Sequence, residues 1–296
     1  SHPSHLVHIH FHTTSIGLNR FDGHRFRTIT QEENEDLSSV LPESDIRILY
    51  FDSFIQKLWV CSVNRMTQYR PQTDDFQTFP FLDASGNTHQ NTSVNCLFRD
   101  DSGILWAGTR RGLYRFDEQT ATFLWCSQPK GIDRFEIKAI YPDENGWIWM
   151  GTSQGLFKFK ADSKGDIQFA DQPEDSSLQK MFESDIRLIC KDDNGYLWLG
   201  VQESGIYAWK AGEVPRFFQH ELSDPFSLDN NDVRAISKDP SGRIWIGTFL
   251  GLNIYNPQTQ RFQRVHHQEG NPKSLGSGSV RSIFFDKRGS AWIGTY

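Results

Sequence analysis

A tryptophan recurs along this chain of 296 residues at a nearly constant interval. The intervals are 47, 43, 49, 47 and 47 residues, and the positions are Trp59, Trp106, Trp149, Trp198, Trp245 and Trp292. Around each one stands a similar phrase: an aspartate, a turn with glycine, apolar residues, the tryptophan, then glycine and threonine. The copy at residues 52–62 is degenerate and lacks the glycine of the turn. A period of about 40 to 50 residues with one aromatic and one glycine signal per unit predicts the blades of a β-propeller.

One well-preserved copy predicts four short strands, at residues 233–238, 243–248, 252–255 and 261–264. Asp239 and Gly242 turn the chain between the first two strands, because aspartate caps such a turn and glycine accepts a positive φ. Short apolar runs separated by turn residues exclude a helical repeat. Since a blade cannot bury both of its faces alone, we expect the tryptophans to pack between adjacent blades.

We predict an all-β fold, a β-propeller of four-stranded antiparallel blades, as a single domain over residues 1–296. Five complete blades lie in 46–264, with an N-terminal partial blade in 1–30 and a C-terminal partial blade in 280–296. Joining the two partial blades would give six blades in a closed ring and would bury the exposed edges. Residues 6–14 also align with a second strand, which would be redundant in that closure. The alternative is part of a seven-bladed ring.

Composition narrows the possible partners. The net charge of −6 argues against nucleic-acid binding that depends on neutralising phosphates. No apolar run approaches the roughly 18 residues of a membrane-spanning helix, and the N-terminus shows no signal-peptide pattern. The four cysteines lack metal-binding spacing, and we expect them to be buried free thiols.

At these repeats the chain resembles the two-component regulator propeller repeat family. The family unit is similar to V-R-x-I-x-x-D-x-x-G-x-L-W-I-G-T-x-x-G-L-x-x-F-D, and residues 233–256 match it nearly position by position. Two loops, 224–228 and 271–275, resemble the N-P-x-S-L segment of the family. The resemblance extends over about residues 6–296.

The resemblance implies a role in sensing. Members of this family form the extracytoplasmic, periplasmic part of membrane-bound hybrid histidine kinases, often from gut Bacteroidetes, that detect oligosaccharides derived from polysaccharides. The expected partners are an oligosaccharide and the neighbouring propeller and kinase regions of a larger receptor, which would be a dimer at full length. By this resemblance the present chain is a ligand sensor and not itself an enzyme.

Basic residues recur at the second position of each innermost strand. They are Arg47, Lys138, Arg187, Arg234 and Arg281. In the remaining innermost strand, Asn95 occupies the equivalent position. The symmetry of a propeller would direct them toward one rim, where they could attract an anionic oligosaccharide such as a uronic or sulfated sugar. Arg110 and Arg111 lie in a connection between second and third strands, which we expect on the same face. The alternative is that each basic side chain bonds neighbouring carbonyl or carboxylate groups.

Other conspicuous residues carry weaker signals. The repeated turn aspartates recur in every blade, so they indicate turn capping more than calcium or acid–base chemistry. His8, His10 and His12 alternate on a predicted strand, yet no metal or cofactor is predicted from them. Trp125, Trp147 and Trp209 lie outside the tryptophan register, and we expect packing roles for them.

Two alternatives to a sensor stay open. The first is a propeller lyase similar to the streptogramin-inactivating enzymes, which would need a non-repeating cluster of histidine and glutamate around a metal. His220, His266 and His267 lie in long loops, but the sequence specifies no acidic partner for them. The second alternative is a protein-interaction scaffold, because the loop-rich faces of propellers also suit that role.

Overall fold

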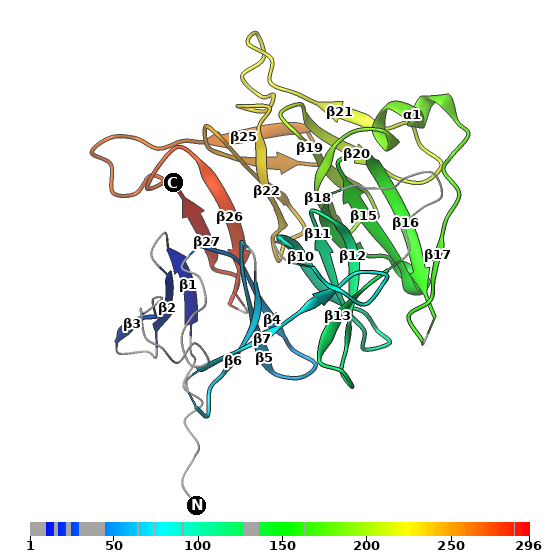
Figure 1. The fold of residues 1–296 in the computed structure, drawn as a ribbon. Helices are drawn as coiled ribbons and strands as arrows, with labels where there is room; N and C mark the ends of the chain where they lie inside the picture. The colour runs from blue at the N-terminus through cyan, green and yellow to red at the C-terminus, as the bar shows by residue number, and fades with distance from the viewer. Residues whose placement is uncertain are drawn as a thin grey trace, which may run out of the picture. The chain divides into compact units, whose positions relative to one another are not determined.

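Antiparallel β-sheets, one for each repeat, make up nearly all of this computed structural model (Figure 1). The structure describes residues 10–14, 17–21, 25–29, 45–63, 65–73, 75–89, 92–126, 136–162, 164–286 and 288–296. The chain divides into two compact units. The first unit comprises Ser1–Ile137 with Ala161–Ile167, and the second comprises Lys138–Lys160 with Gln168–Tyr296.

Four of the sheets contain four strands each in the order of the sequence. They are β4 (Ile46–Asp52), β5 (Lys57–Ser62), β6 (Met66–Arg70) and β7 (Asp75–Phe79); β14 (Ile137–Pro142), β15 (Trp147–Thr152), β16 (Gly155–Ala161) and β17 (Ile167–Phe169); β18 (Ile186–Lys191), β19 (Leu197–Val201), β20 (Gly205–Trp209) and β21 (Arg216–Phe218); and β22 (Val233–Lys238), β23 (Ile244–Thr248), β24 (Leu252–Asn256) and β25 (Arg261–Val265). A fifth sheet has the same core of β10 (Val94–Arg99), β11 (Leu105–Thr109), β12 (Gly112–Asp117) and β13 (Thr122–Trp125). The four-stranded blade predicted from the repeat is confirmed.

The two terminal sheets are partial. One contains β1 (His10–Thr14), β2 (Gly17–Phe21) and β3 (Phe26–Ile29), and the other contains β26 (Val280–Phe285) and β27 (Ala291–Thr295). The pairing of Thr14 with Gly17 is the one that Thr109 and Gly112 make between second and third strands. Strand β1 is therefore a second strand, as β27 is. Each of the two partial sheets thus has a second strand of its own.

The repeated tryptophan packs against the next sheet along the chain. In the first unit Trp59 is fully buried, with its ring centroid 5.3 Å from that of Phe116. In the second unit Trp149 lies 5.9 Å from Trp209, and Trp198 lies 4.7 Å from Tyr255. Packing of these tryptophans between adjacent blades is thus confirmed within each unit. Trp209, one of the tryptophans outside the register, belongs to the same core.

The turn aspartate has two roles. One carboxylate oxygen of Asp239 accepts the backbone N–H of Arg243, and the other accepts the indole N–H of Trp245 at 2.9 Å. Equivalent indole bonds are 2.8 Å for Asp100–Trp106, 3.0 Å for Asp192–Trp198 and 3.2 Å for Asp286–Trp292. Turn capping was predicted, but the bond to the tryptophan was not. Gly242 has a φ of +84°, as expected for the turn.

Two of the loops contain secondary structure that the repeat pattern does not predict. In the loop at 80–93, the short strands β8 (Phe81–Leu82) and β9 (Thr88–His89) extend the sheet beside β13. The loop at 170–185 contains the helix α1 (Ser176–Phe182). Asp175 caps the N-terminus of this helix by accepting the N–H of Ser177, and Met181 of the helix is buried. A 3₁₀ turn, η1 (Glu144–Gly146), precedes β15. Among the residues described, no helix has the length and apolar character needed to cross a membrane.

All four cysteines are free thiols, as predicted. Cys61 and Cys126 are buried, and the other two are partly buried. Burial raises the pKa of the Cys126 thiol to about 12. A thiol with such a pKa is inert at neutral pH.

The glycine two residues after the tryptophan lets the next blade approach closely. A Cβ on Gly151 would lie 2.7 Å from the Cγ2 atom and 2.8 Å from the carbonyl oxygen of Ile186, in the first strand of the next blade. Gly151→Ala should therefore lower the free energy of unfolding by about 1–3 kcal/mol, the usual cost of overpacking. Denaturant unfolding measures this loss. Gly278→Ala is the control, because its Cβ would meet only an ordinary contact at 3.5 Å, and equal losses in both variants would contradict the explanation.

The turn aspartates should also make the stability of the fold depend on pH. Burial raises the pKa of Asp239, but hydrogen bonds from Ser241, Arg243 and Trp245 outweigh burial and hold it at about 2. Because this folded-state pKa lies below the ordinary value, the stabilisation is complete above about pH 5 and is lost as the pH falls toward 2. Asp239→Asn should lower the melting temperature at pH 7 and flatten its decline between about pH 5 and 2. The same decline in Asp239→Asn as in the exposed control Glu269→Gln would refute this account.

Candidate functional site

The connections between second and third strands meet the start of the first strand at one end of each sheet. In the second unit, Phe249 donates its backbone N–H to the carbonyl of Asp232 at 3.1 Å, and Gln202 donates to that of Asp185 at 3.0 Å. Arg110 and Ser93 make the same bond in the first unit at 3.1 Å. The prediction that these two kinds of loop share a face is confirmed in these three sheets. We call this end of the sheets the loop end.

A β-bulge sets the direction of the predicted basic side chains at the loop end. The register shifts after the first residue of five innermost strands, and the bulge contains Arg47, Asn95, Arg187, Arg234 and Arg281. A bulge leaves its extra residue outside the regular ladder and re-aims its side chain. The basic residues therefore recur at a place where the backbone is irregular.

In the second unit these basic side chains reach toward the following blade. The Nζ atom of Lys138 lies 2.7 Å and 2.8 Å from the two carboxylate oxygens of Asp185. Arg187 lies 3.7 Å from Asp232, which precedes the next innermost strand. Arg234 bonds the hydroxyl of Ser279 at 2.7 Å and also its own neighbour Asp232 at 2.7 Å. Lys138, Arg187 and Arg234 thus have carboxylate partners, as the alternative interpretation expected.

In the first unit the corresponding side chains make contacts that differ from one residue to the next. Asn95 donates to Glu136 at 3.0 Å, and Arg110 lies 3.8 Å from the same carboxylate. Arg47 lies 3.9 Å from Asp45, and both side chains are largely exposed. The guanidinium of Arg111 lies 3.4 Å from the ring of His89.

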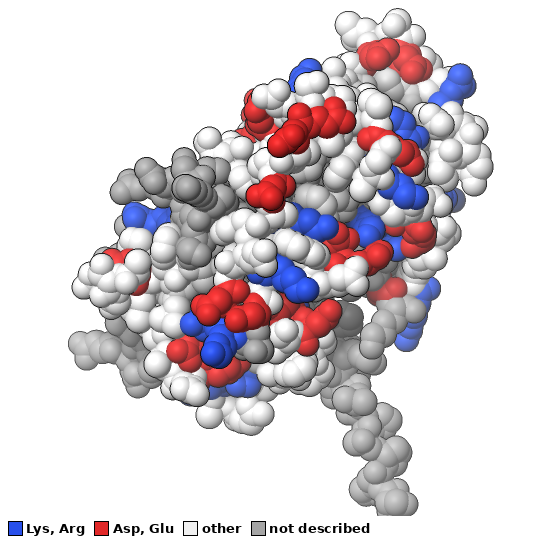
Figure 2. Space-filling view, turned by 90° about the vertical axis from the view of Figure 1, so that its right-hand side faces the viewer, with Lys and Arg blue, Asp and Glu red and all other residues white. Residues whose placement is uncertain are grey.

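Charged side chains of both signs occur together on one side of the molecule (Figure 2). On the face that Figure 2 shows, acidic and basic side chains are interspersed, and no large basic area stands out. Lys138, Arg187, Arg234 and Arg281 stand on successive innermost strands of the second unit, with Asp185 and Asp232 among them.

An exposed aromatic residue, Phe249, lies at the loop end in the connection between β23 and β24. The side chain of Phe249 is 50% exposed, and the guanidinium of Arg234 lies 4.7 Å from its ring centroid. Leu250 beside it is 48% exposed. In the equivalent connections other copies have Ser153 and Gln154 or Gln202 and Glu203. The sequence places all of these pairs in connections that we expect on the face where a ligand would bind. Arg281 lies 4.9 Å from the ring of Tyr296 in the equivalent arrangement.

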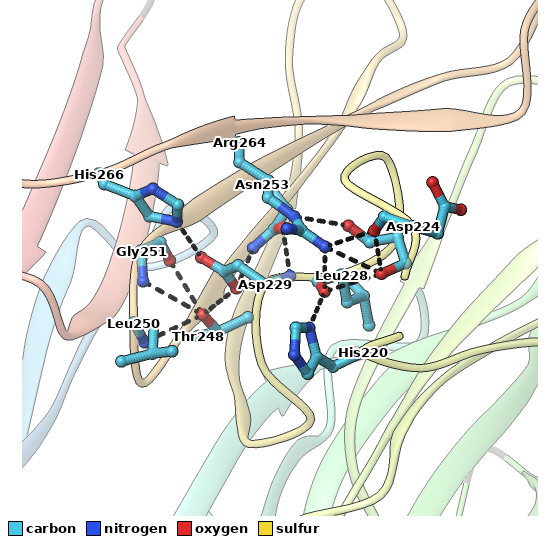
Figure 3. A network of polar contacts seen from close by, with 11 residues as sticks. His220, Asp224, Leu228, Asp229, Thr248, Leu250, Gly251, Asn253, Arg264 and His266 are labelled. Atoms are coloured by element: carbon cyan, nitrogen blue, oxygen red, sulfur yellow. Dashed lines mark hydrogen bonds and ion pairs between the residues drawn. The ribbon is translucent and has the colours of Figure 1, made fainter. Parts of the chain in front are cut away.

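A buried polar network fixes this connection (Figure 3). The Oδ1 atom of Asp229 accepts hydrogen bonds from the hydroxyl of Thr248 at 2.6 Å and from the amide of Asn253 at 2.7 Å. The Thr248 hydroxyl in turn accepts the backbone N–H of Leu250 at 3.2 Å. His266 faces the other oxygen of Asp229 at 3.1 Å. The connection that contains Phe249 is therefore held rigidly.

The loop histidines named for the lyase alternative do not converge. His220 bonds the carbonyl of Leu228 at 2.8 Å, and His267 bonds that of Leu275 at 2.6 Å, so the two hold equivalent N-P-x-S-L-type loops. His266 instead contacts Asp229. Within the described ranges, no group of three metal-ligating side chains is found. The alternating histidines near the N-terminus have side chains outside the described residues.

Four-stranded sheets that pack through a repeated tryptophan define the blades of a β-propeller. The family model "Two component regulator propeller" matches residues 88–111, 133–154, 227–249 and 274–296. Four segments of this chain thus match the repeat of the two component regulator propeller family.

Solved structures with the same fold include extracellular domains of putative two component systems. The chain is similar to the extracellular domain of a putative hybrid two component system from B. thetaiotaomicron, with 23% identity and a TM-score of 0.73 over 97% of this chain and 37% of that one. A second such domain from the same organism has 18% identity and a TM-score of 0.56 over 97% and 42%. Streptogramin B lyase has 13% identity and a TM-score of 0.65 over 95% and 84%. The chain thus spans less than half of these two extracellular domains, and a search of curated proteins finds no match.

The contact between Lys138 and Asp185 should couple two neighbouring blades. Both side chains are partly buried, and the pair is close. In a double-mutant cycle of Lys138→Met and Asp185→Asn, we expect a coupling energy of about 0.5–1 kcal/mol in denaturant unfolding. Lys273→Met, which removes an exposed lysine, is the control for loss of charge. A coupling energy of zero within error would show that the pair does not tie the blades together.

Proposed function

We propose that this chain is part of an extracytoplasmic sensor and that its loop end binds an oligosaccharide. The observation that supports this most directly is the Arg234–Phe249 pair, a guanidinium stacked on an exposed aromatic ring at a rigid connection. Sugars present apolar C–H faces that pack on flat rings, and hydroxyls that bond charged side chains. A rim with both carboxylates and guanidinium groups supplies acceptors and donors together.

The proposal assigns ligand contacts to the basic residues of the loop end. In the second unit these are Lys138, Arg187, Arg234 and Arg281, and in the first unit they are Arg47, Arg110 and Arg111. Because several of them already have carboxylate partners, an anionic sugar would compete with those partners at this rim. Neutral hydroxyls could bond the same groups without displacing them.

The signalling part of the proposal concerns regions outside this chain. The matched family is named for two component regulators, and two structural relatives are extracellular domains of hybrid two component systems. We infer that ligand binding here is relayed through a neighbouring propeller to a histidine kinase in a dimeric, periplasmic-facing receptor. The engagement of His220 and His267 in loop structure favours this sensor role over the lyase role.

Calorimetric titration with a panel of neutral and acidic oligosaccharides tests the proposed function. Phe249→Ala should weaken binding by about tenfold, because it removes the exposed ring on which a sugar would pack. Arg187→Ala combined with Arg234→Ala should weaken it further. Leu222→Ala is the matched control, since this side chain is 97% exposed and lies in a different loop. If no oligosaccharide in the panel binds while a protein is captured without glycan dependence, the interaction-scaffold alternative replaces this proposal.

A further inference from the structure

A pocket on the β22–β25 blade is lined by residues other than those of the connection that contains Phe249. It has a volume of about 530 Å³ and is formed by β24, β25 and the loop that precedes β22. This volume is within the range of about 300–1,000 Å³ that is typical of small-molecule sites. The residues that matter for the argument are Pro225, Phe226, Arg243, Ile254, Arg261 and Arg264.

Three arginines line this pocket, and no acidic residue lines it. Arg264 donates to the carbonyls of Asp224, Ser227 and Leu228 and to the Ser227 hydroxyl, so its charge meets no carboxylate there. Arg261 lies over the ring of Phe226, 4.4 Å from its centroid, and in the described part of the chain it has no carboxylate partner. Arg243 alone of the three is paired with an acid, Asp239, at 2.6 Å. The pocket therefore carries an excess of positive charge in a chain of net charge −6.

The wall of the pocket beside these arginines is apolar and rigid. The side chain of Phe226 is 45% exposed, yet its backbone N–H and its carbonyl are both hydrogen-bonded. Its N–H donates to the side chain of Asp224 at 2.9 Å, and its carbonyl accepts the N–H of Phe262 at 2.9 Å. The guanidinium of Arg261 packs against the Phe226 ring, and among the described residues it makes no hydrogen bond to another side chain or carbonyl. A planar guanidinium with available N–H groups suits an oxyanion, which it can bind through two parallel hydrogen bonds.

We propose that this pocket binds the charged group of an acidic sugar, a carboxylate or a sulfate, with the sugar ring packed on Phe226 and Ile254. The inference rests on the proposed function in taking the ligand to be an oligosaccharide, and it specifies that the oligosaccharide is acidic. It also moves recognition of the anion away from the loop end, where Lys138, Arg187 and Arg234 already have carboxylate partners.

The test is a calorimetric titration of the whole chain with three probes: trigalacturonate, a sulfated disaccharide and neutral galactotriose. The wild-type chain should bind one of the acidic probes more tightly than the neutral one, and the acidic probe that binds identifies carboxylate or sulfate. Arg261→Met should weaken binding of that probe by about tenfold, the effect of losing one charge-assisted contact, and should leave galactotriose unaffected. Arg261→Lys should retain part of the affinity because it keeps the charge. Arg288→Met is the matched control, since it removes an exposed arginine outside the pocket.

The outcomes separate this inference from the proposed function. If the wild-type chain binds galactotriose as tightly as the acidic probes, or if Arg261→Met binds the acidic probe as tightly as wild type, the pocket assignment is wrong and the sensor proposal stands. If no probe and no member of the wider oligosaccharide panel binds, the proposed function fails, and the pocket assignment fails with it. Circular dichroism and the melting temperature establish that each variant is folded. An equal loss in Arg261→Met and Arg288→Met would also overturn the assignment, because it would reflect net charge alone.

Discussion

The fold depends on an indole ring that packs against the next blade, and in four of the repeats the turn aspartate accepts the N–H of that ring. Trp198 is 1% exposed and lies beside Tyr255, and Asp192 of the preceding turn accepts its N–H. A buried donor without a partner would cost about 1–3 kcal/mol. One aspartate therefore caps the turn and removes this cost, which explains why the turn and the tryptophan recur together. At Trp149 the arrangement differs, since Lys158 bonds Asp143 and lies over the indole ring. Within the part of the chain that the structure describes, the buried N–H of Trp149 has no hydrogen-bond partner, and neither has that of Trp59.

Charged side chains at both ends of the innermost strands reinforce this packing. At the loop end, the second residue reaches forward to an acid that precedes the following innermost strand, as Lys138 does to Asp185. At the opposite end, the last residue of the strand reaches back to the turn of the preceding blade, as Lys191 does to Asp143 and Arg99 does to Asp52. Basic residues thus recur at fixed places for reasons of packing, whatever ligand the protein binds.

The repeat made the strands, the blades and the buried tryptophans predictable, because each depends on a local pattern that is present in several copies. The four strands predicted around Trp245 match β22–β25 to within one residue at their ends. The bulge at Arg234 and its pairing with Asp232 were not predictable, since both depend on register and on rotamers. Likewise, α1 lies in a loop where the copies differ in sequence, so no repeat pattern could reveal it.

The same reasoning indicates where ligand specificity should reside. Residues that are common to all copies are needed for the contacts between sheets, and their side chains are largely occupied by those contacts. Residues that break the pattern are free of this requirement. Phe249 stands where another copy has Gln202, and Phe226 stands where the next copy has Lys273. Both aromatic rings are exposed, and both are stacked with an arginine. Recognition by this propeller should therefore depend on departures from the repeat, because only there can the surface change without weakening the ties between blades.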